Sequence, residues 1–220
     1  MRKRNIALIL AASMMATFAF GGTTTFAAEE GKTDSVTVGI MADPENMGPW
    51  SGMSQGRIAV LFTTYEYLLT RENGVAYGVL AKNWEAVDPK TYDVELYDYI
   101  HDAAGNPLTA SDVVFSFESA IATKNYGKLS VIDSVTAIDD YHVEFKFNKD
   151  LEIGEFENVM LECAIVTQAA YEASPDQMAT TPVGTSAYLV ESYVPGSEVV
   201  MKDTGNYWQT DESLVHGTSI

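Results

Sequence analysis

The side chains best suited to metal binding or nucleophilic catalysis are few and scattered. The histidines are His101, His142 and His216, and the only cysteine is Cys163. They form no paired-His or paired-Cys motif, and the sequence contains no Gly-rich phosphate loop and no nucleophile elbow. We expect His142 to be a solvated residue on a hairpin strand and Cys163 to be a buried, inert thiol. The sequence therefore predicts no catalytic residue, no metal ligand and no cofactor.

Carboxylates are abundant, and two of them facing each other across a cleft could form a glycoside hydrolase site. The chain has 31 Asp and Glu against 13 Lys and Arg, a net charge of −18. Most of the acids alternate with apolar residues, as solvent-facing strand positions do, so no pair stands out. His101 beside Asp102 could form a weak metal or acid–base pair, but a loop hydrogen bond is the favoured interpretation. So acidic a surface argues against a nucleic-acid partner.

The positive signal is a tryptophan in a loop. Trp50 lies in a stretch rich in Gly, Pro and Ser, where a ring has less reason to be buried. Clefts that bind organic solutes combine rings with a few placed polar groups. Core packing is expected to explain most of the other rings that flank turns and element ends. The candidate ligand-binding residues of this loop are Trp50, Ser51, Gly52, Met53, Ser54 and Gln55.

The elements that must position this loop can be read from hydrophobic periodicity. Alternation predicts a strand over residues 35–40, and spaced apolar residues predict a helix over 54–69. A half-buried strand is predicted over 91–100, followed by a helix over 109–123. Thr109 and Asp112 have the spacing of a capping box at the start of that helix.

Two hairpins follow in the second half of the chain. One joins residues 135–138 and 141–147 around Asp139-Asp140, and the other joins 187–193 and 198–201 around Pro195-Gly196. Between them we expect a short buried strand at Ile165-Val166 and a short helix over 168–173. With 46% hydrophobic residues the chain can bury a core, and the order of elements indicates a mixed α/β fold.

The first 27 residues have the pattern of a secretory signal peptide. Arg2, Lys3 and Arg4 precede an uncharged apolar run, and small residues then offer a cleavage site after Ala27. A transmembrane anchor is the alternative, but the apolar run is short for about 20 spanning residues. No cysteine lies near the cleavage region, so a lipoprotein anchor is not supported. A periplasmic or extracellular location, including the cell surface, is predicted.

Four blocks of sequence, in order, resemble the solute-binding proteins of family 5, the extracellular dipeptide, oligopeptide and nickel receptors of ABC importers. Residues 96–117 read LYDYIHDAAGNPLTASDVVFSF, which is similar to the family's strand, turn, Pro-Leu-Thr-Ala segment and following helix. Residues 181–188 read TPVGTSAY, which resembles Pro-Val-Gly-Thr-Gly-Pro-Tyr. Asn206-Tyr207-Trp208 and Asp43-Pro44 also fit. Each block is weak alone, but together the resemblance covers nearly the whole mature chain.

The resemblance implies an α/β fold of the type II periplasmic-binding-protein kind. Residues 28–65 and 166–220 would belong to lobe I, residues 66–165 would form the extra subdomain of the family, and the second lobe would be missing. The loop from Trp50 to Gln55 would face the cleft. The departures are Ser186-Ala187 in place of Gly-Pro and two inserted residues in the turn 102–105, which blur the substrate subgroup.

The resemblance also places Gly184, Thr185 and Ser186 where the chain re-enters lobe I. A glycine there permits close backbone approach, and the two hydroxyls could bond a solute. A simple turn into a strand explains the three residues equally well.

The function implied is a non-catalytic receptor that captures a solute between two lobes and delivers it to the permease subunits of an ABC importer. An oligopeptide is the favoured solute. The alternatives are a secreted carbohydrate- or peptide-active enzyme and a ligand-presenting sensory module. This chain alone is expected to be an N-terminal fragment that binds poorly, because half of a two-lobed site buries little ligand surface. A self-contained globule with Trp50 sealed inside would count against the receptor interpretation.

Overall fold

The computed structural model describes residues 36–215, so the predicted signal peptide lies outside the described residues. The chain divides into two units, Met1–Gly39 and Ile40–Ile220, and the fold described below is that of the second. The predicted strand at residues 35–40 is wrong for its described part. Val36 and Val38 are exposed and form no strand, because alternation alone does not make a strand and the described residues pair no neighbour with this segment.

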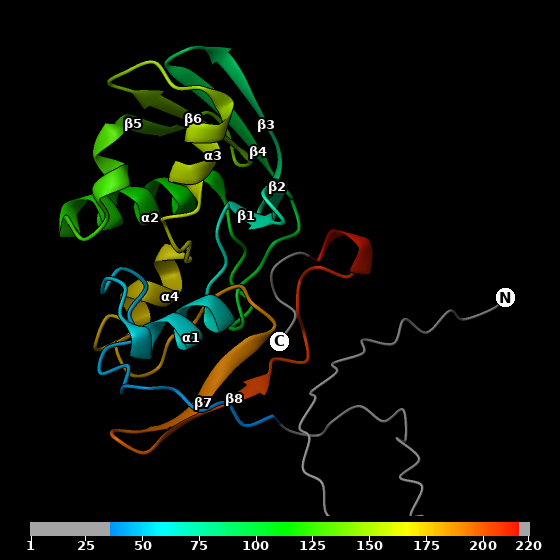
Figure 1. The fold of residues 1–220 in the computed structure, drawn as a ribbon. Helices are drawn as coiled ribbons and strands as arrows, with labels where there is room; N and C mark the ends of the chain where they lie inside the picture. The colour runs from blue at the N-terminus through cyan, green and yellow to red at the C-terminus, as the bar shows by residue number, and fades with distance from the viewer. Residues whose placement is uncertain (1–35, 216–220) are drawn as a thin grey trace, which may run out of the picture. The chain divides into compact units, whose positions relative to one another are not determined.

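The larger sheet has four antiparallel strands in the order β3–β4–β6–β5 (Figure 1). They span Ala81–Asp88 (β3), Thr91–Leu96 (β4), His142–Phe147 (β6) and Ile132–Ala137 (β5). The half-buried strand predicted over 91–100 is confirmed as β4, which ends earlier, at Leu96, and buries Tyr92, Val94 and Leu96. The predicted hairpin around Asp139-Asp140 is confirmed as β5–β6.

Two helices complete the core beside this sheet. Helix α2 spans Ala110–Thr123 and has the predicted capping box, in which the Thr109 amide donates to the Asp112 carboxylate at 2.8 Å. Helix α3 spans Ile153–Met160 and was not predicted from the sequence. Its Phe156 ring stacks on Tyr92 with centroids 4.2 Å apart. A short 3₁₀ helix, η1 at Gly127–Val131, connects α2 to β5.

The helix predicted over 54–69 begins as expected but ends early. Helix α1 spans Gln55–Thr64, and the chain then enters the hairpin β1–β2, formed by Leu69–Glu72 and Val75–Gly78. Asn73 and Gly74 form its turn with φ of 50° and 84°. An Asn-Gly pair is the strongest short hairpin signal, and the apolar spacing of Leu68 and Leu69 had concealed it.

The last elements lie beside α1. Helix α4 spans Gln168–Ala173, as predicted, and the predicted second hairpin is confirmed as β7 (Tyr188–Val194) and β8 (Glu198–Asp203). A 3₁₀ helix, η2, follows at Glu212–Leu214. The predicted strand at Ile165-Val166 is a single backbone bridge between Ile165 and Glu66. None of the helices in the described range is both long and apolar enough to cross a bilayer.

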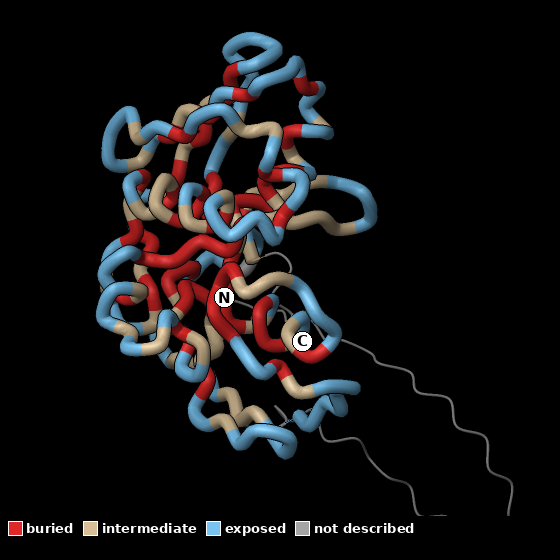
Figure 2. The backbone as a smooth tube through the Cα atoms, turned by 90° about the vertical axis from the view of Figure 1, so that its left-hand side faces the viewer, coloured by how far each residue is buried: buried red, intermediate tan, exposed pale blue. Residues whose placement is uncertain are grey.

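One large hydrophobic cluster runs from the four-stranded sheet to α1 and α4, and a small second cluster joins α1 to the β7–β8 hairpin. The buried stretches gather between the four-stranded sheet with its helices and the elements around α1 (Figure 2). This meeting point holds the end of α1, the Glu66–Ile165 bridge and the buried Trp208. It is the scaffold on which the candidate binding loop rests.

Candidate functional site

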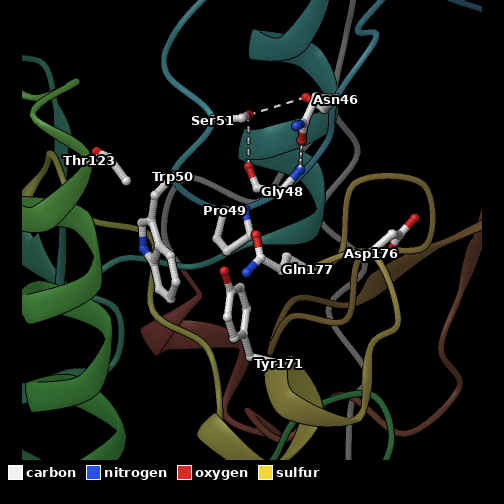
Figure 3. A pocket seen from close by; sticks show the side chains of 9 residues that line it. All are labelled: Asn46, Gly48, Pro49, Trp50, Ser51, Thr123, Tyr171, Asp176 and Gln177. Atoms are coloured by element: carbon white, nitrogen blue, oxygen red, sulfur yellow. Dashed lines mark hydrogen bonds between the residues drawn. The ribbon is translucent and has the colours of Figure 1, made fainter.

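A small open pocket lies between the loop before α1 and the start of the chain beyond α4. Its volume is about 140 Å³, room for a few water molecules or one small side chain. Three parts of the chain besides the loop contribute to it: the C-terminal end of α2, helix α4 and the turn after α4 (Figure 3). Its lining consists of Asn46, Gly48, Pro49, Trp50, Ser51, Thr123, Tyr171, Asp176 and Gln177.

Trp50 is buried, so the expectation that its ring is free of the core is wrong. Only 5% of it is exposed, and its indole N–H donates to the Ala164 carbonyl at 3.0 Å. The ring packs against Phe115 and Tyr171, with centroids 5.7 and 5.0 Å away. Aromatic partners from two helices and a buried acceptor outweigh the polar character of the neighbouring loop residues. Trp50 therefore forms a wall of the pocket rather than a projecting ring.

The residues after Trp50 become progressively more exposed. The Ser51 hydroxyl donates to the Gly48 carbonyl at 2.8 Å, and Gly52 has a φ of 83°, which favours glycine. Ser54 is the N-cap of α1 and accepts from the Arg57 amide at 3.3 Å. Met53, Ser54 and Gln55 are exposed. The loop thus has a braced first half and a solvent-facing second half.

Arg57 of α1 holds the segment before the helix in place. Its guanidinium donates to the Pro44 carbonyl at 2.9 Å and to the Ser51 carbonyl at 2.8 Å. Asn125, after α2, adds a hydrogen bond of 2.9 Å from its amide to the Trp50 carbonyl. These bonds satisfy backbone acceptors in a segment without regular structure, so the loop has a defined path.

Gly184, Thr185 and Ser186 lie in the interior, at the end of α1. A Cβ on Gly184 would lie 2.0 Å from the Thr64 carbonyl oxygen, so the close approach made possible by this glycine is to α1. The Ser186 hydroxyl donates to the Thr63 carbonyl at 2.6 Å, and Thr185 is 2% exposed. The structure therefore favours the turn-and-packing interpretation over solute-facing hydroxyls.

Tyr171 and Gln177 are pocket residues that were not predicted from the sequence. Among the described residues, neither the Tyr171 hydroxyl nor the Gln177 amide has a hydrogen-bond partner, and both side chains lie beside Pro49 in Figure 3. Burial raises the pKa of Tyr171, so the hydroxyl is neutral. Gln177 and Met178 both have left-handed backbones, with φ of 56° and 64°, a strained arrangement for two consecutive non-glycine residues. This left-handed turn is the local feature that marks the position of Gln177, and it cannot be read from the sequence.

Asp176, by contrast, is occupied within its own turn. Its carboxylate accepts from the Thr180 hydroxyl at 2.5 Å and the Ser174 hydroxyl at 3.0 Å. The Thr180 bond, more than the others, lowers the pKa of Asp176. The ionised group stabilises the turn that carries Gln177.

The remaining candidate chemistry is structural. Within residues 36–215 no group of His, Cys, Asp and Glu is placed to hold a metal ion. The prediction of a buried thiol is confirmed, because Cys163 is fully buried and burial raises its pKa well above the usual value. Asp102 is also buried, and it accepts hydrogen bonds within its turn and from the Thr167 hydroxyl. His101 contacts the Asp102 carbonyl at 3.0 Å, the predicted loop hydrogen bond.

Comparison with known proteins places this fold. A family model, "Bacterial extracellular solute-binding proteins, family 5 Middle", matches residues 76–217. The nickel-binding protein NikA of Staphylococcus aureus is 28% identical over 68% of this chain and 30% of its own length. The periplasmic murein peptide-binding protein MppA of Escherichia coli is 21% identical over 80% of this chain and 37% of its own.

Solved structures agree on the architecture. The open form of MppA superposes with a TM-score of 0.68 at 22% identity, covering 77% of this chain and 37% of MppA. An oligopeptide-binding protein of Thermotoga maritima, solved with mannohexaose bound, gives 0.64 at 27% identity, covering 76% and 32%. The chain spans about a third of the length of these relatives. Since the family model matches well over half of its residues, this chain belongs to the family 5 bacterial extracellular solute-binding proteins.

Proposed function

We propose that the protein is the capture component of an ABC importer, a non-catalytic receptor for a peptide-like or other small organic solute. The observation that carries the proposal is the family match over residues 76–217, since the family consists of binding proteins. Its relatives include a nickel-binding protein and a murein peptide-binding protein. An oligopeptide is the preferred solute for this chain, delivered to permease subunits at the membrane.

The organisation proposed for the protein follows from the same membership. Residues 28–65 and 166–220 belong to lobe I, and residues 66–165 form the subdomain. We call the place where the chain enters and leaves the subdomain the crossing. The backbone bridge from Glu66 to Ile165 supports this assignment. A signal peptide at residues 1–27 exports the chain to the periplasm or the cell surface. Solute capture requires a second lobe that contacts the solute when the two close on it.

The proposed solute contacts are the exposed half of the loop and the two unpaired groups of the pocket. Met53, Ser54 and Gln55 offer an apolar side chain and two polar ones to solvent. The Tyr171 hydroxyl and the Gln177 amide can each donate and accept, which suits the alternating N–H and C=O groups of a peptide. Trp50 packs against Tyr171 and supports it from behind, whereas Gly184, Thr185 and Ser186 pack at the other end of α1.

The test of the receptor function is calorimetry on the full-length protein with three panels: short peptides, nickel–histidine complexes and oligosaccharides. We expect binding to peptides, with the peptide recovered at unchanged mass. Absence of binding in all three panels would contradict the proposal. A solute recovered as cleaved product would instead support the secreted-enzyme alternative.

The proposed contacts are tested by removing one hydrogen-bonding group at a time. Tyr171→Phe deletes only the hydroxyl, and Gln177→Asn shortens the amide while keeping a residue that tolerates the left-handed backbone. We expect each to weaken solute binding by about two- to tenfold, the value of one hydrogen bond. Tyr99→Phe, at an exposed tyrosine outside the pocket lining, is the matched control and should bind like the parent. Unchanged affinity in both pocket variants would exclude these contacts.

A further inference from the structure

Glu66 carries a buried carboxylate at the crossing, where two segments of the chain lie side by side. It lies between the end of α1 and the start of β1 and is 3% exposed. Its carbonyl accepts from the Ile165 amide at 3.0 Å. The residue therefore stands at both predicted boundaries of the subdomain at once.

Its side chain holds a third, distant segment. The Tyr207 hydroxyl donates to Oε1 at 2.6 Å, and the Trp208 indole N–H donates to Oε2 at 2.8 Å. Both donors come from the loop that leaves β8. Trp208 is 3% exposed and packs against Tyr97 and Tyr99. The Glu66 carboxylate thus binds the loop after β8 to the crossing.

No cation neutralises this carboxylate in the described part of the chain. The ion pairs found there join other acids to lysine, arginine and histidine. Burial raises the pKa of Glu66 to about 6, against the opposing effect of the hydrogen bonds from Tyr207 and Trp208. In the described part of the chain, Tyr207 is the titratable group that hydrogen-bonds to Glu66, and its own pKa is raised by burial and by the Glu66 charge. The ionised carboxylate of Glu66 is therefore stabilised by hydrogen bonds and by no ion pair in the described residues.

The two donors are not equivalent when the carboxylate takes up a proton. An indole N–H can only donate, so Oε2 must remain an acceptor in both states. The proton therefore goes to Oε1, and the Tyr207 hydroxyl must change from donor to acceptor. Tyr207 is partly exposed, so its own hydrogen can turn towards water. The neutral form then keeps both contacts without a buried charge.

We propose that Glu66 is a protonation-controlled latch that fastens residues 204–209 to the crossing, closed more firmly when the carboxyl is neutral than when it is ionised. Opening the latch exposes Glu66 to water, where a carboxylate is well solvated. The closed form consequently binds more protons than the open form. Opening becomes easier as the pH rises from the ordinary value of 4.5 through about 6, and levels off above that.

Hydrogen exchange measured by mass spectrometry tests the latch without reference to any solute. Protection of peptides covering residues 204–209 is compared at pH 5 and pH 7.5, after correction for intrinsic exchange. We expect protection to fall on the order of tenfold at the higher pH. In Glu66→Gln the amide oxygen accepts from Trp208 and the amide nitrogen donates to Tyr207, so protection should be independent of pH. Glu85→Gln, at an exposed acid on β3, is the control and should keep the parental response.

Two outcomes would overturn the proposal: the same pH response in parent and Glu66→Gln, or protection that rises with pH. A second measurement keeps it testable if Glu66→Gln does not fold. Infrared difference spectroscopy across the same pH range should show a buried neutral carboxyl appearing near pH 6. In Tyr207→Phe, which loses one donor to the anion, that transition should move to higher pH. A transition that stays at the same pH in Tyr207→Phe would exclude the proposed contact.

Discussion

The four-stranded sheet and the α1–hairpin region are stabilised in different ways. The sheet region is held by rings: Phe156 stacks on Tyr92 and meets Phe145 and Phe147 edge-on. Beside α1, the β7–β8 hairpin rests on a cluster whose buried members are only Met47, Val60 and Val190. The first region can be expected to unfold as a unit, and the second can open locally at lower cost.

Polar contacts compensate for the small cluster in the second region. The Asp43 carboxylate accepts from the Tyr193 hydroxyl and the Gly196 amide, which joins the loop before α1 to the tip of the hairpin. One of these bonds is partly buried and the other is exposed to solvent, so each adds less stability than buried packing of the same extent. The hairpin therefore owes its position to directed bonds and the sheet owes its position to packing.

The largest effect should come from the sheet core. Phe156→Ala removes a fully buried ring and should lower the free energy of unfolding by about 4 kcal/mol. Denaturant unfolding measures the loss. Phe62→Ala, at a half-exposed ring on α1, is the control and should lose much less. Equal losses would show that the sheet is not the more tightly packed region.

A smaller and local effect is expected in the hairpin. Val190→Ala removes two buried methyl groups and should cost about 2 kcal/mol. Because β7 packs on few residues, hydrogen exchange should accelerate in β7–β8 and stay unchanged in β4 and β6. Val194→Ala, exposed on the same strand, should leave exchange as it is. Faster exchange spread equally over both sheets would contradict the distinction between the two regions.

The smallest effect is expected from the Asp43 contacts with the β7–β8 hairpin, which should weaken in acid. Hydrogen bonds, first that from Tyr193, lower the pKa of Asp43 below its ordinary value of 3.8. A lowered pKa means that the contact is complete above pH 3.8 and is lost as the pH falls through the lower, folded-state value. Exchange at the hairpin tip should therefore quicken in strong acid, opposite in direction to the response at Glu66. In Asp43→Asn the tip should exchange faster at neutral pH and lose this acid response. A parental acid response in the variant would exclude Asp43 as its source.

Elements with local signals could be predicted from the sequence. The capping residues Thr109 and Asp112, and the turns at Asp139-Asp140 and Pro195-Gly196, are specified within a few residues, and all three are confirmed. Helix α3 was missed although Phe156, Val159 and Met160 have helical spacing, because its N-cap is Glu152 and not one of the Ser, Thr, Asp or Asn residues that usually mark a helix start. The strand β3 was missed because its burial pattern shows little alternation.

The candidate site could be predicted only in part, because contacts across the chain decide it. Nothing near Trp50 indicates that its indole N–H meets Ala164, more than a hundred residues away. Tyr171 and Gln177 likewise reach the loop only through folding. Met53, Ser54 and Gln55, which the resemblance implies face the cleft, are exposed; their part in binding stays a prediction.

The backbone bridge between Glu66 and Ile165 has a consequence for how this architecture can vary. The first and last residues of the segment 66–165 are joined by a backbone hydrogen bond. The two ends of a replacement segment would therefore attach at neighbouring points, whatever its length. A graft from a relative can therefore be joined there, provided that it keeps the contacts that residues 66–165 make with the rest of the chain, such as the packing of Phe115 against Trp50.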